Sequence, residues 1–323
     1  MKEFLIGRND AGQRLDRFAK KAAPGLPDSL LQKYLRRKDI KINGKPGKGD
    51  ARLVEGDTVR LYIPDEFFET KGGDRDDWRK VSAPKLAIAY EDENILVVDK
   101  KPGVLCHASE GWSASTLIAQ IQAYLHAKGE WDPRQENSFA PALCNRIDRN
   151  TGGLVIAAKN AEALRIMDEK IKEREMEKRY LCVVLGRPKR SEGRLEGYLF
   201  KDAKKNQVYV YDSPRTGALW AATEYKVLES RGELSLVECR LITGRTHQIR
   251  AQMAHLGHPL LGDGKYGVEK VNRRYGEKMQ LLYSYSLRFV FERESGCLAY
   301  LDGKPVTAPQ KPAFVEKYFG SAK

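Results

Sequence analysis

The sequence lacks the features of a membrane protein and of a disulfide-stabilised secreted protein. No apolar run approaches the ~20 residues that a membrane-spanning helix needs. The opening segment, MKEFLIGRNDAG, turns polar too soon for a signal peptide. The five cysteines are scattered and never form a C-x-x-C pair, which suits reduced thiols better than disulfides or a zinc site. These absences predict a cytoplasmic protein that does not bind membranes.

Positive charge, by contrast, is abundant. The 323 residues include 57 Lys and Arg against 44 Asp and Glu, a formal net charge of +13. Such an excess attracts polyanions and favours nucleic acid as the partner. The chain is longer than one typical domain and 41% of its residues are hydrophobic, so two domains with buried cores are expected.

Residues 1–65 read as a separate small α/β domain. Apolar residues three and four positions apart predict two amphipathic helices, one with Leu15, Phe18, Ala19 and Ala22 and one with Leu30, Leu31, Tyr34 and Leu35. Pro24, Gly25 and Pro27 separate the two helices, and Asp28 or Ser29 can cap the second. The segments IKINGKPG and RLVEGDTVRLYIP alternate around glycine turns and predict short strands.

This first segment is also basic, with 15 Lys and Arg against nine Asp and Glu. Its QRLDRFAKK, SLLQKYLRRKDIKINGK and VEGDTVRL stretches resemble the RNA-binding module shared by a small-subunit ribosomal protein, tyrosyl-tRNA synthetases and many RNA-modifying enzymes. The resemblance implies that residues 1–65 bind RNA, with Arg36, Arg37 and Lys38 among the contacts. The alternative is a solvated basic face without a ligand.

The rest of the chain reads as a linker and one larger domain. Residues 66–84 lack periodicity and contain Gly-Gly, charges and proline, which is typical of a linker. From residue 85 to 323, β-branched segments recur and often follow one another without a helix between them. This pattern predicts an α+β domain around a mixed, largely antiparallel sheet.

The stretch NRIDRNTGGLVIAAKN places an acidic residue, Asp148, in a turn before an apolar strand. The two arginines that flank it can hold an anionic substrate, and Gly152 and Gly153 permit a tight backbone. Taken alone, an aspartate in such a turn is most often structural.

The surrounding segments make the pattern specific. NRIDRNTGG resembles the active-site signature of RluA-type pseudouridine synthases, H-R-L-D-x-x-T-S-G. Other segments of that family lie on both sides of it in the expected order: ILVVDKKPGVLCH before it, and EKRYLCVVLG, LITGRTHQIRAQMAHLGHPLLGD and LLYSYSLRF after it. Two departures occur, because Asn145 stands where the family usually has His and Gly152 where it usually has Ser. The resemblance implies an isomerase that converts uridine in structured RNA to pseudouridine.

The resemblance implies that Asp148 is the catalytic nucleophile or base. Pseudouridine formation breaks the glycosidic bond to the uracil nitrogen, turns the base and rejoins it through carbon-5. A carboxylate can attack the ribose or assist removal of the proton on its carbon-2. The carboxylate must be ionised, and a nearby cation favours that form. Arg250 of GRTHQIR matches the family residue with this role, and Arg245 is the less favoured candidate.

Three more positions follow from the resemblance. Tyr180 of EKRY matches an aromatic residue that stacks on the flipped base and can help to remove the carbon-5 proton. Arg146 matches a residue that fills the space left by the flipped nucleotide, and Leu282 matches one that lines the pocket. Base flipping is required because a stacked helix shields the glycosidic bond. Without the resemblance, Tyr180 would be read as a core or edge aromatic and Arg250 as a surface ion-pair residue.

Other motifs have weaker support. Gly262-Asp-Gly264-Lys-Tyr-Gly267 matches G-x-G-x-x-G, but it follows a proline-containing loop and opens no evident helix. His247, His255 and His258 have no cysteine close in sequence and are read as structural or RNA-contacting residues instead of zinc ligands. Neither a metal nor any other cofactor is expected.

Alternative functions remain at this stage. His255-Leu-Gly-His258 is similar to the nucleotide-binding signature of class I aminoacyl-tRNA synthetases, but the doubly wound domain and the lysine-rich loop of those enzymes are missing. A non-catalytic RNA-binding assembly factor would not need Asp148. The expected substrate is large-subunit ribosomal RNA, with tRNA as the alternative, and nothing in the sequence requires an oligomer.

Overall fold

The computed structural model describes residues 1–69, 77–82, 84–108 and 115–320. The chain divides into two compact units. The first comprises Met1–Lys85, His107–Ala142 and Ala158–Arg165, and the second comprises Leu86–Cys106, Leu143–Ala157 and Ile166–Lys323. The linker predicted at residues 66–84 lies partly outside the described residues, and the domain boundaries drawn from the sequence stay a prediction.

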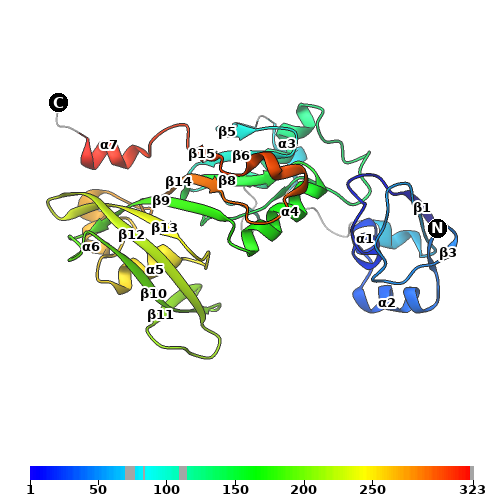
Figure 1. The fold of residues 1–323 in the computed structure, drawn as a ribbon, viewed down its shortest axis with the longest axis horizontal. Helices are drawn as coiled ribbons and strands as arrows, with labels where there is room; N and C mark the ends of the chain where they lie inside the picture. Colours follow the sequence, from blue (N-terminus) through cyan, green and yellow to red (C-terminus); the bar gives the residue numbers. More distant parts are fainter. Residues whose placement is uncertain (70–76, 83, 109–114, 321–323) are drawn as a thin grey trace. The chain divides into compact units, whose positions relative to one another are not determined.

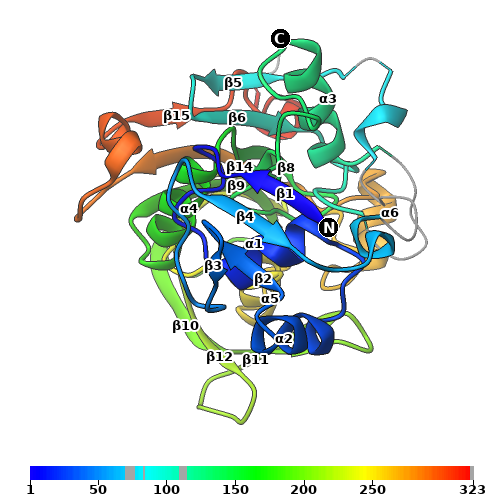
Figure 2. The same cartoon turned by 90° about the vertical axis from the view of Figure 1, so that its right-hand side faces the viewer.

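The first unit contains a four-stranded sheet in the order β1-β4-β2-β3 among its described residues. The strands are β1 (Lys2–Leu5), β2 (Ile40–Ile42), β3 (Lys45–Pro46) and β4 (Thr58–Leu61). Helices α1 (Leu15–Ala22) and α2 (Asp28–Arg36) accompany them, all in blue shades in Figure 2. Phe18 and Leu15 of α1 are fully buried in the same core as Ile40 and Val59 of the sheet. The apolar spacing of the sequence thus predicts both helices correctly.

Two local features of this unit differ from the sequence expectations. The segment KEFL is too short to show a period, and β1 forms there by antiparallel pairing with β4, a partner over fifty residues away. The capping prediction is also wrong. Asp28 is the first residue of α2, Pro27 holds the cap position, and no side chain caps the helix.

A hydrogen-bonded cluster connects the loop after β1 to residues 136–138 of the same unit. Asp10 is 2% exposed and accepts hydrogen bonds from Asn137 Nδ2 (2.7 Å) and Ser138 Oγ (2.5 Å). Gln13 Nε2 donates to Ser138 Oγ at 2.7 Å. The unit also contains the 3₁₀ helices η1 (Asp65–Phe68) and η2 (Trp78–Lys80) and helix α3 (Leu117–Ala127). Residues 1–65 are therefore held by a later part of the chain through buried polar contacts.

The described residues also form an eleven-stranded sheet. Nine strands follow the order β11-β10-β12-β13-β9-β14-β8-β6-β5, while β15 pairs with β14 and β7 with β8. Figure 1 shows β14, in orange, beside the green strands β8 and β9. The bounds are β5 (Ile88–Glu91), β6 (Ile95–Lys100), β7 (Ala142–Leu143), β8 (Gly152–Ala158), β9 (Met176–Leu185), β10 (Glu192–Asp202), β11 (Gln207–Tyr211), β12 (Leu219–Arg231), β13 (Leu234–Leu241), β14 (Leu282–Phe289) and β15 (Pro305–Thr307).

Most pairings in this sheet are antiparallel, including those of β9 with β13 and with β14, whereas β14 and β8 run parallel. The remaining helices are α4 (Ala161–Lys172), α5 (Gln248–His255), α6 (Glu269–Tyr275), η3 (Gly296–Leu301) and α7 (Ala313–Phe319). The α+β class with a mixed, largely antiparallel sheet is confirmed. No helix in the described ranges is both long and apolar enough to cross a membrane.

Helix α5 packs on the centre of this sheet. Ile249 and Met253 of α5 share a core with Tyr180 and Cys182 of β9 and with Leu282 of β14. Strands β9 and β14 are antiparallel neighbours, so their residues on one face meet the same helix. The packing places the beginning of α5 next to the aromatic residue of the EKRY segment.

Gly153 allows β8 to lie against β14. Its φ is +107°, and a Cβ added there would lie 2.1 Å from the backbone oxygen of Ser284. At Gly152 an added Cβ would lie 2.6 Å from ring carbons of Tyr283. Gly153 is therefore required by the backbone of this parallel pairing, and Gly152 is required as long as Tyr283 keeps its ring in place.

We expect Gly153→Ala to lower the free energy of unfolding by about 3 kcal/mol or more, because the methyl group meets backbone and the conformation is strained. The matched control is Gly303→Ala, at φ +71° with no atom within 4 Å of the added Cβ. The control should lose about 1 kcal/mol, the strain of a left-handed alanine. Urea unfolding measures both, and equal losses would contradict the close packing at Gly153.

Candidate active site

The loop between β7 and β8 carries Asp148 and is tied to the segment after β6. The backbone oxygen of Arg149 accepts hydrogen bonds from Gly103 N and from Lys100 Nζ, both at 2.9 Å. Lys100 is 1% exposed and also donates to the backbone oxygens of Val104 (2.9 Å) and Lys101 (3.2 Å). Burial lowers the pKa of Lys100 to about 8, so its ammonium is still mainly protonated at neutral pH. The buried lysine thus fixes the loop that presents Asp148.

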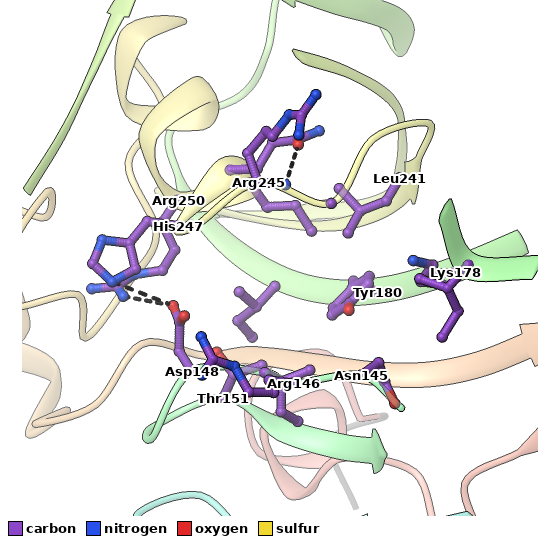
Figure 3. A pocket seen from close by; sticks show the side chains of 16 residues that line it. Asn145, Arg146, Asp148, Thr151, Lys178, Tyr180, Leu241, Arg245, His247 and Arg250 are labelled. Atoms are coloured by element: carbon purple, nitrogen blue, oxygen red, sulfur yellow. Dashed lines mark hydrogen bonds and ion pairs between the residues drawn. The ribbon is translucent and has the colours of Figure 1, made fainter. Parts of the chain in front are cut away.

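Asp148 forms an ion pair with Arg250 of α5. Arg250 Nη1 donates to Asp148 Oδ2 at 2.7 Å (Figure 3). The side chain of Arg250 is 6% exposed and that of Asp148 is 26% exposed, so the carboxylate is the more accessible partner. No described residue donates a hydrogen bond to the other oxygen, Oδ1. One oxygen of Asp148 is therefore fixed, and the other has no hydrogen-bond donor among the described residues of the pocket.

A second carboxylate holds Arg250 from the other side. Arg250 Nε and Nη2 donate to Asp263 Oδ2 (2.7 Å) and Oδ1 (2.9 Å), a two-point contact with a fully buried side chain. Burial alone would lower the pKa of Arg250, but the hydrogen bonds and charges of Asp263 and Asp148 outweigh it and raise that pKa. Burial alone would likewise raise the pKa of Asp263, yet Arg250 brings it below its usual value. The guanidinium is charged throughout the physiological range.

The glycine-rich segment 262–267 builds this second carboxylate site. Asp263 Oδ1 also accepts from the backbone N–H groups of Lys265 (2.8 Å) and Tyr266 (3.1 Å). A Cβ added at Gly267 would lie 2.3 Å from the backbone oxygen of Asp263. The glycines permit a tight turn around Asp263, which explains the segment without a dinucleotide site.

His247 lies at the N-cap of α5 and, like Arg250, is close to the carboxylate of Asp148. Its Nε2 is 3.9 Å from Asp148 Oδ2, and its Nδ1 is 2.9 Å from the hydroxyl of Tyr266. That hydroxyl oxygen accepts from Val208 N at 2.8 Å. Because Nδ1 is occupied by the Tyr266 hydroxyl, Nε2 is the ring nitrogen that lies nearest to Asp148. Burial lowers the pKa of His247, so the ring is neutral at pH 7.

The left-handed backbone of His247 adds a second feature. Its φ is +51°, which costs about 1–3 kcal/mol for a residue other than glycine and is found at functional sites. The following residue, Gln248, anchors this turn, because its Oε1 accepts from Thr243 Oγ1 (2.7 Å) and from Arg245 N (2.9 Å). The turn therefore aims both His247 and Arg250 at Asp148.

These residues line one pocket in the second unit (Figure 3). Its walls are Asn145, Arg146, Ile147, Asp148, Thr151, Ile171, Lys178, Tyr180, Leu241, Gly244, Arg245, His247, Gln248, Ile249, Arg250 and Leu282. Tyr180 and Leu282 are each 6% exposed and form its floor with the aliphatic side chains. Burial raises the pKa of Tyr180 to about 12, so its hydroxyl stays protonated at neutral pH. An apolar floor, a carboxylate and several cations together fit a flat, neutral ring attached to an anionic chain.

The pocket contains six of the residues for which the sequence predicts a catalytic or substrate-binding role: Arg146, Asp148, Tyr180, Arg245, Arg250 and Leu282. Arg245 does not pair with Asp148; its Nε donates to the backbone oxygen of Trp220 at 3.3 Å. Arg146 is exposed at the same loop. Arg36, Arg37 and Lys38 belong to the first unit, where all three are exposed at the end of α2, and Arg37 pairs with Asp39 at 3.0 Å.

The two departures from the family signature have local explanations. Asn145 Oδ1 accepts from Ile156 N at 2.8 Å, so its side chain holds the strand that follows the loop. Gly152 lies under the ring of Tyr283, whose hydroxyl donates to Asp99 Oδ1 at 2.5 Å. Neither residue contacts the carboxylate of Asp148 in the described contacts.

Sequence reasoning missed the roles of Lys100, Lys178 and Asp263 at the site. It named His247 but did not place it beside Asp148. Asp263 follows GHPLLG, over a hundred residues from Asp148, and no spacing rule connects the two. The three histidines have separate partners, with His255 near Asp212 and His258 near Leu185. In the described part of the chain, no group of three or more His, Cys, Asp or Glu could hold a metal ion. Independence from metals stays a prediction.

Known proteins are similar in sequence to this chain over most of its length. Residues 94–255 match the family described as RNA pseudouridylate synthase. The chain is 30% identical over 294 residues to ribosomal large subunit pseudouridine synthase C of Salmonella typhi, covering 90% of this chain and 88% of that protein. It is 31% identical over 277 residues to the Escherichia coli K12 protein of the same name, covering 86% and 83%. The chain belongs to the RNA pseudouridylate synthase family.

Solved structures agree with this fold. The human RNA pseudouridylate synthase domain containing 4 protein superposes with a TM-score of 0.54 at 21% identity, covering 71% of this chain and 90% of that one. The human domain containing 1 protein gives 0.52 at 22% identity, covering 77% and 96%. As a family member, the synthase is an isomerase that acts on uridine in RNA.

We expect Asp263→Asn to lower kcat of the synthase by about 10²-fold, since Arg250 loses its charged anchor and Asp148 loses its alignment. Breaking the buried pair should also cost about 3–5 kcal/mol of stability. RNA affinity should change little. The control is Asp212→Asn, whose side chain is 85% exposed. A wild-type kcat in Asp263→Asn, measured where the variant is folded, would show that Asp148 does not depend on this anchor.

Proposed function

We propose that the synthase isomerises one or more uridines of large-subunit ribosomal RNA, with Asp148 as the carboxylate that acts on the ribose. The observation that carries the catalytic assignment is the half-paired carboxylate. Arg250 holds Oδ2, while Oδ1 accepts no hydrogen bond from the described residues, and Asp148 lines the same pocket as Tyr180 and Leu282. The preference for ribosomal RNA over tRNA is supported by the names of the two bacterial relatives, which align over more than four fifths of their length.

The chemistry follows from that free oxygen. The N1–C1′ bond of the target uridine breaks, and its electron pair leaves with the uracil. Asp148 Oδ1 either bonds to C1′ or takes the proton from C2′, and both routes stabilise the detached sugar. The uracil turns, C5 bonds to C1′, and Asp148 or the C2′ proton returns to its starting state. The C5 proton is lost and N1 gains a proton, so the product is an isomer of the substrate.

Tyr180 contributes its ring and a neutral hydroxyl. The flipped uracil stacks on the ring, as bases commonly do on aromatic side chains. With its pKa raised to about 12, the hydroxyl is a hydrogen-bond donor at neutral pH, not a phenolate base. It takes part in removal of the C5 proton only by passing that proton onward.

The decisive test pairs a cell experiment with one variant. A strain without the synthase should lack specific pseudouridines in large-subunit ribosomal RNA, and these should return with the wild-type chain but not with Asp148→Asn. In vitro, Asp148→Asn should bind RNA within a few-fold of wild type, because phosphate contacts dominate affinity. Asp212→Asn is the matched control. Pseudouridine formed by Asp148→Asn would falsify the catalytic assignment. If the deletion strain lost pseudouridines only from tRNA, the substrate of the synthase would be tRNA and not ribosomal RNA.

Residues 1–65 are proposed to add RNA affinity. The support is their sequence similarity to an RNA-binding module and the exposed cluster Arg36, Arg37 and Lys38 at the end of α2. Deleting this segment would also remove buried Asp10, which accepts hydrogen bonds from Asn137 and Ser138. A truncation therefore mixes the loss of RNA contacts with the loss of structure around residues 137 and 138.

Substitution is the sharper experiment. Changing Arg36, Arg37 and Lys38 together to Gln should weaken RNA binding and lower the slope of log K against log salt by ~0.7 per lost contact on single strands. Turnover at saturation should remain near wild type, since the pocket is untouched. The control carries the same charge change at exposed Lys270, Lys278 and Lys311. An unchanged salt slope in the first variant would leave the basic cluster as solvated surface.

A further inference from the structure

Lys178 occupies a special place in the pocket. It lies on β9 two residues before Tyr180, so both side chains emerge on the same face of the strand, with Cα atoms about 6.6 Å apart. Both line the pocket. Figure 3 shows Tyr180 between Asp148 at one end and Lys178 with Asn145 at the other. A ring that rests on Tyr180 with its sugar at Asp148 therefore directs its far edge towards Lys178.

The ammonium of Lys178 has no partner in the described residues. By contrast, Arg250 is paired with Asp148 and Asp263, and Arg179 is paired with Glu238 at 3.0 Å. Lys178 is half-buried, and burial lowers its pKa. A partly desolvated, unpaired charge is unfavourable unless a ligand supplies the missing partner. At the end of the pocket beyond Tyr180, the ammonium of Lys178 thus lacks a hydrogen-bond acceptor among the described residues, and a ligand can provide one.

The side-chain amide of Asn145, at the same end of the pocket, also has an N–H donor without an acceptor in the described part of the chain. The oxygen of the Asn145 side chain already accepts from Ile156 N. Its Nδ2 group, a donor only, has no partner among the described contacts. This end of the pocket therefore offers N–H donors to a ligand. It suits the edge of a ring that carries carbonyl oxygens and a negative charge.

Exposure distinguishes Lys178 from the other unneutralised cations of the pocket. Arg146 and Arg245 are exposed, as expected of residues that meet the RNA backbone at the entrance. Lys178 is half-buried, and it lines the pocket together with Leu241, its partner in the ladder with β13, and Ile171. Its position fits the base better than the phosphate.

The reaction creates a negative charge on that base. When the N1–C1′ bond breaks, the electron pair leaves with the uracil, which becomes an anion delocalised over N1 and its two carbonyl oxygens. We infer that Lys178 is a further catalytic residue, whose ammonium donates to a carbonyl oxygen of the uracil and stabilises the detached uracil anion while it turns. The inference rests on the catalytic site proposed above. Lys178 keeps its proton throughout, and the charge that it stabilises disappears when C5 bonds to C1′ and N1 is protonated.

A preorganised cation that faces charge formed only during the reaction acts on the rate, not on binding. Lys178→Met should therefore lower the single-turnover rate by about 10²-fold or more, with the RNA Kd within about 2-fold and its salt dependence unchanged. Lys178→Arg keeps the charge and should retain a measurable part of the rate. Tritium release from RNA labelled at C5 of the target uridine measures the rate, and filter binding at several salt concentrations measures the Kd.

The controls separate the possible failures. Lys311→Met removes the same charge from an exposed site and should behave as wild type. Lys178→Gln is a second neutral variant for use if the methionine variant does not fold, as judged by circular dichroism. A wild-type rate in a folded neutral variant overturns the inference. A raised Kd with a salt slope lower by ~0.7 and an unchanged rate overturns it as well, because Lys178 then binds a phosphate.

Asp148→Asn, measured in parallel, tests the underlying site. If Asp148→Asn is inactive and Lys178→Met is normal, only the role of Lys178 is wrong. If Asp148→Asn remains active, the proposed catalytic site itself fails. The two results are therefore distinguishable in one set of assays.

Discussion

The geometry of the active site depends on how the guanidinium of Arg250 divides its donors. Asp263 takes Nε and Nη2, and this leaves only Nη1 for Asp148. An arginine without this anchor can bind both oxygens of a carboxylate in a fork, and neither oxygen would then be left without a donor. Because the buried Asp263 occupies that fork, Arg250 fixes the orientation of Asp148 and leaves one of its oxygens to the substrate.

The surrounding fold serves this arrangement from three sides. Lys100 ties the Asp148 loop to the segment after β6, while the left-handed turn at His247 aims α5 at the pocket. The tight glycine loop brings the backbone N–H groups of residues 265 and 266 onto Asp263. Polar contacts thus position the catalytic groups, whereas the apolar core of α5, β9 and β14 supplies the floor on which a base can lie.

Sequence patterns predict the features of this fold that depend on residues close together in the sequence. The spacing of Leu15 and Phe18 predicts α1, and the turn residues of NRIDRNTGG place Asp148 before a buried strand, where the structure has β8. Strand β1 and the role of Asp263 could not be predicted in this way, because each depends on a partner distant in sequence. In the sequence, Lys178 is only one charge of EKRY. The role inferred for Lys178 depends on its having no carboxylate partner among the described residues, and this can be seen only in the three-dimensional structure.

The glycine at position 152 also constrains how this site can vary during evolution. The ring of Tyr283 occupies the space that a side chain at 152 would need, and its hydroxyl is held by Asp99. The serine that the signature usually has at this position fits only if residue 283 is smaller or its side chain is turned away. Positions 152 and 283 are therefore expected to vary together among relatives, because the residue at one position limits which residues fit at the other.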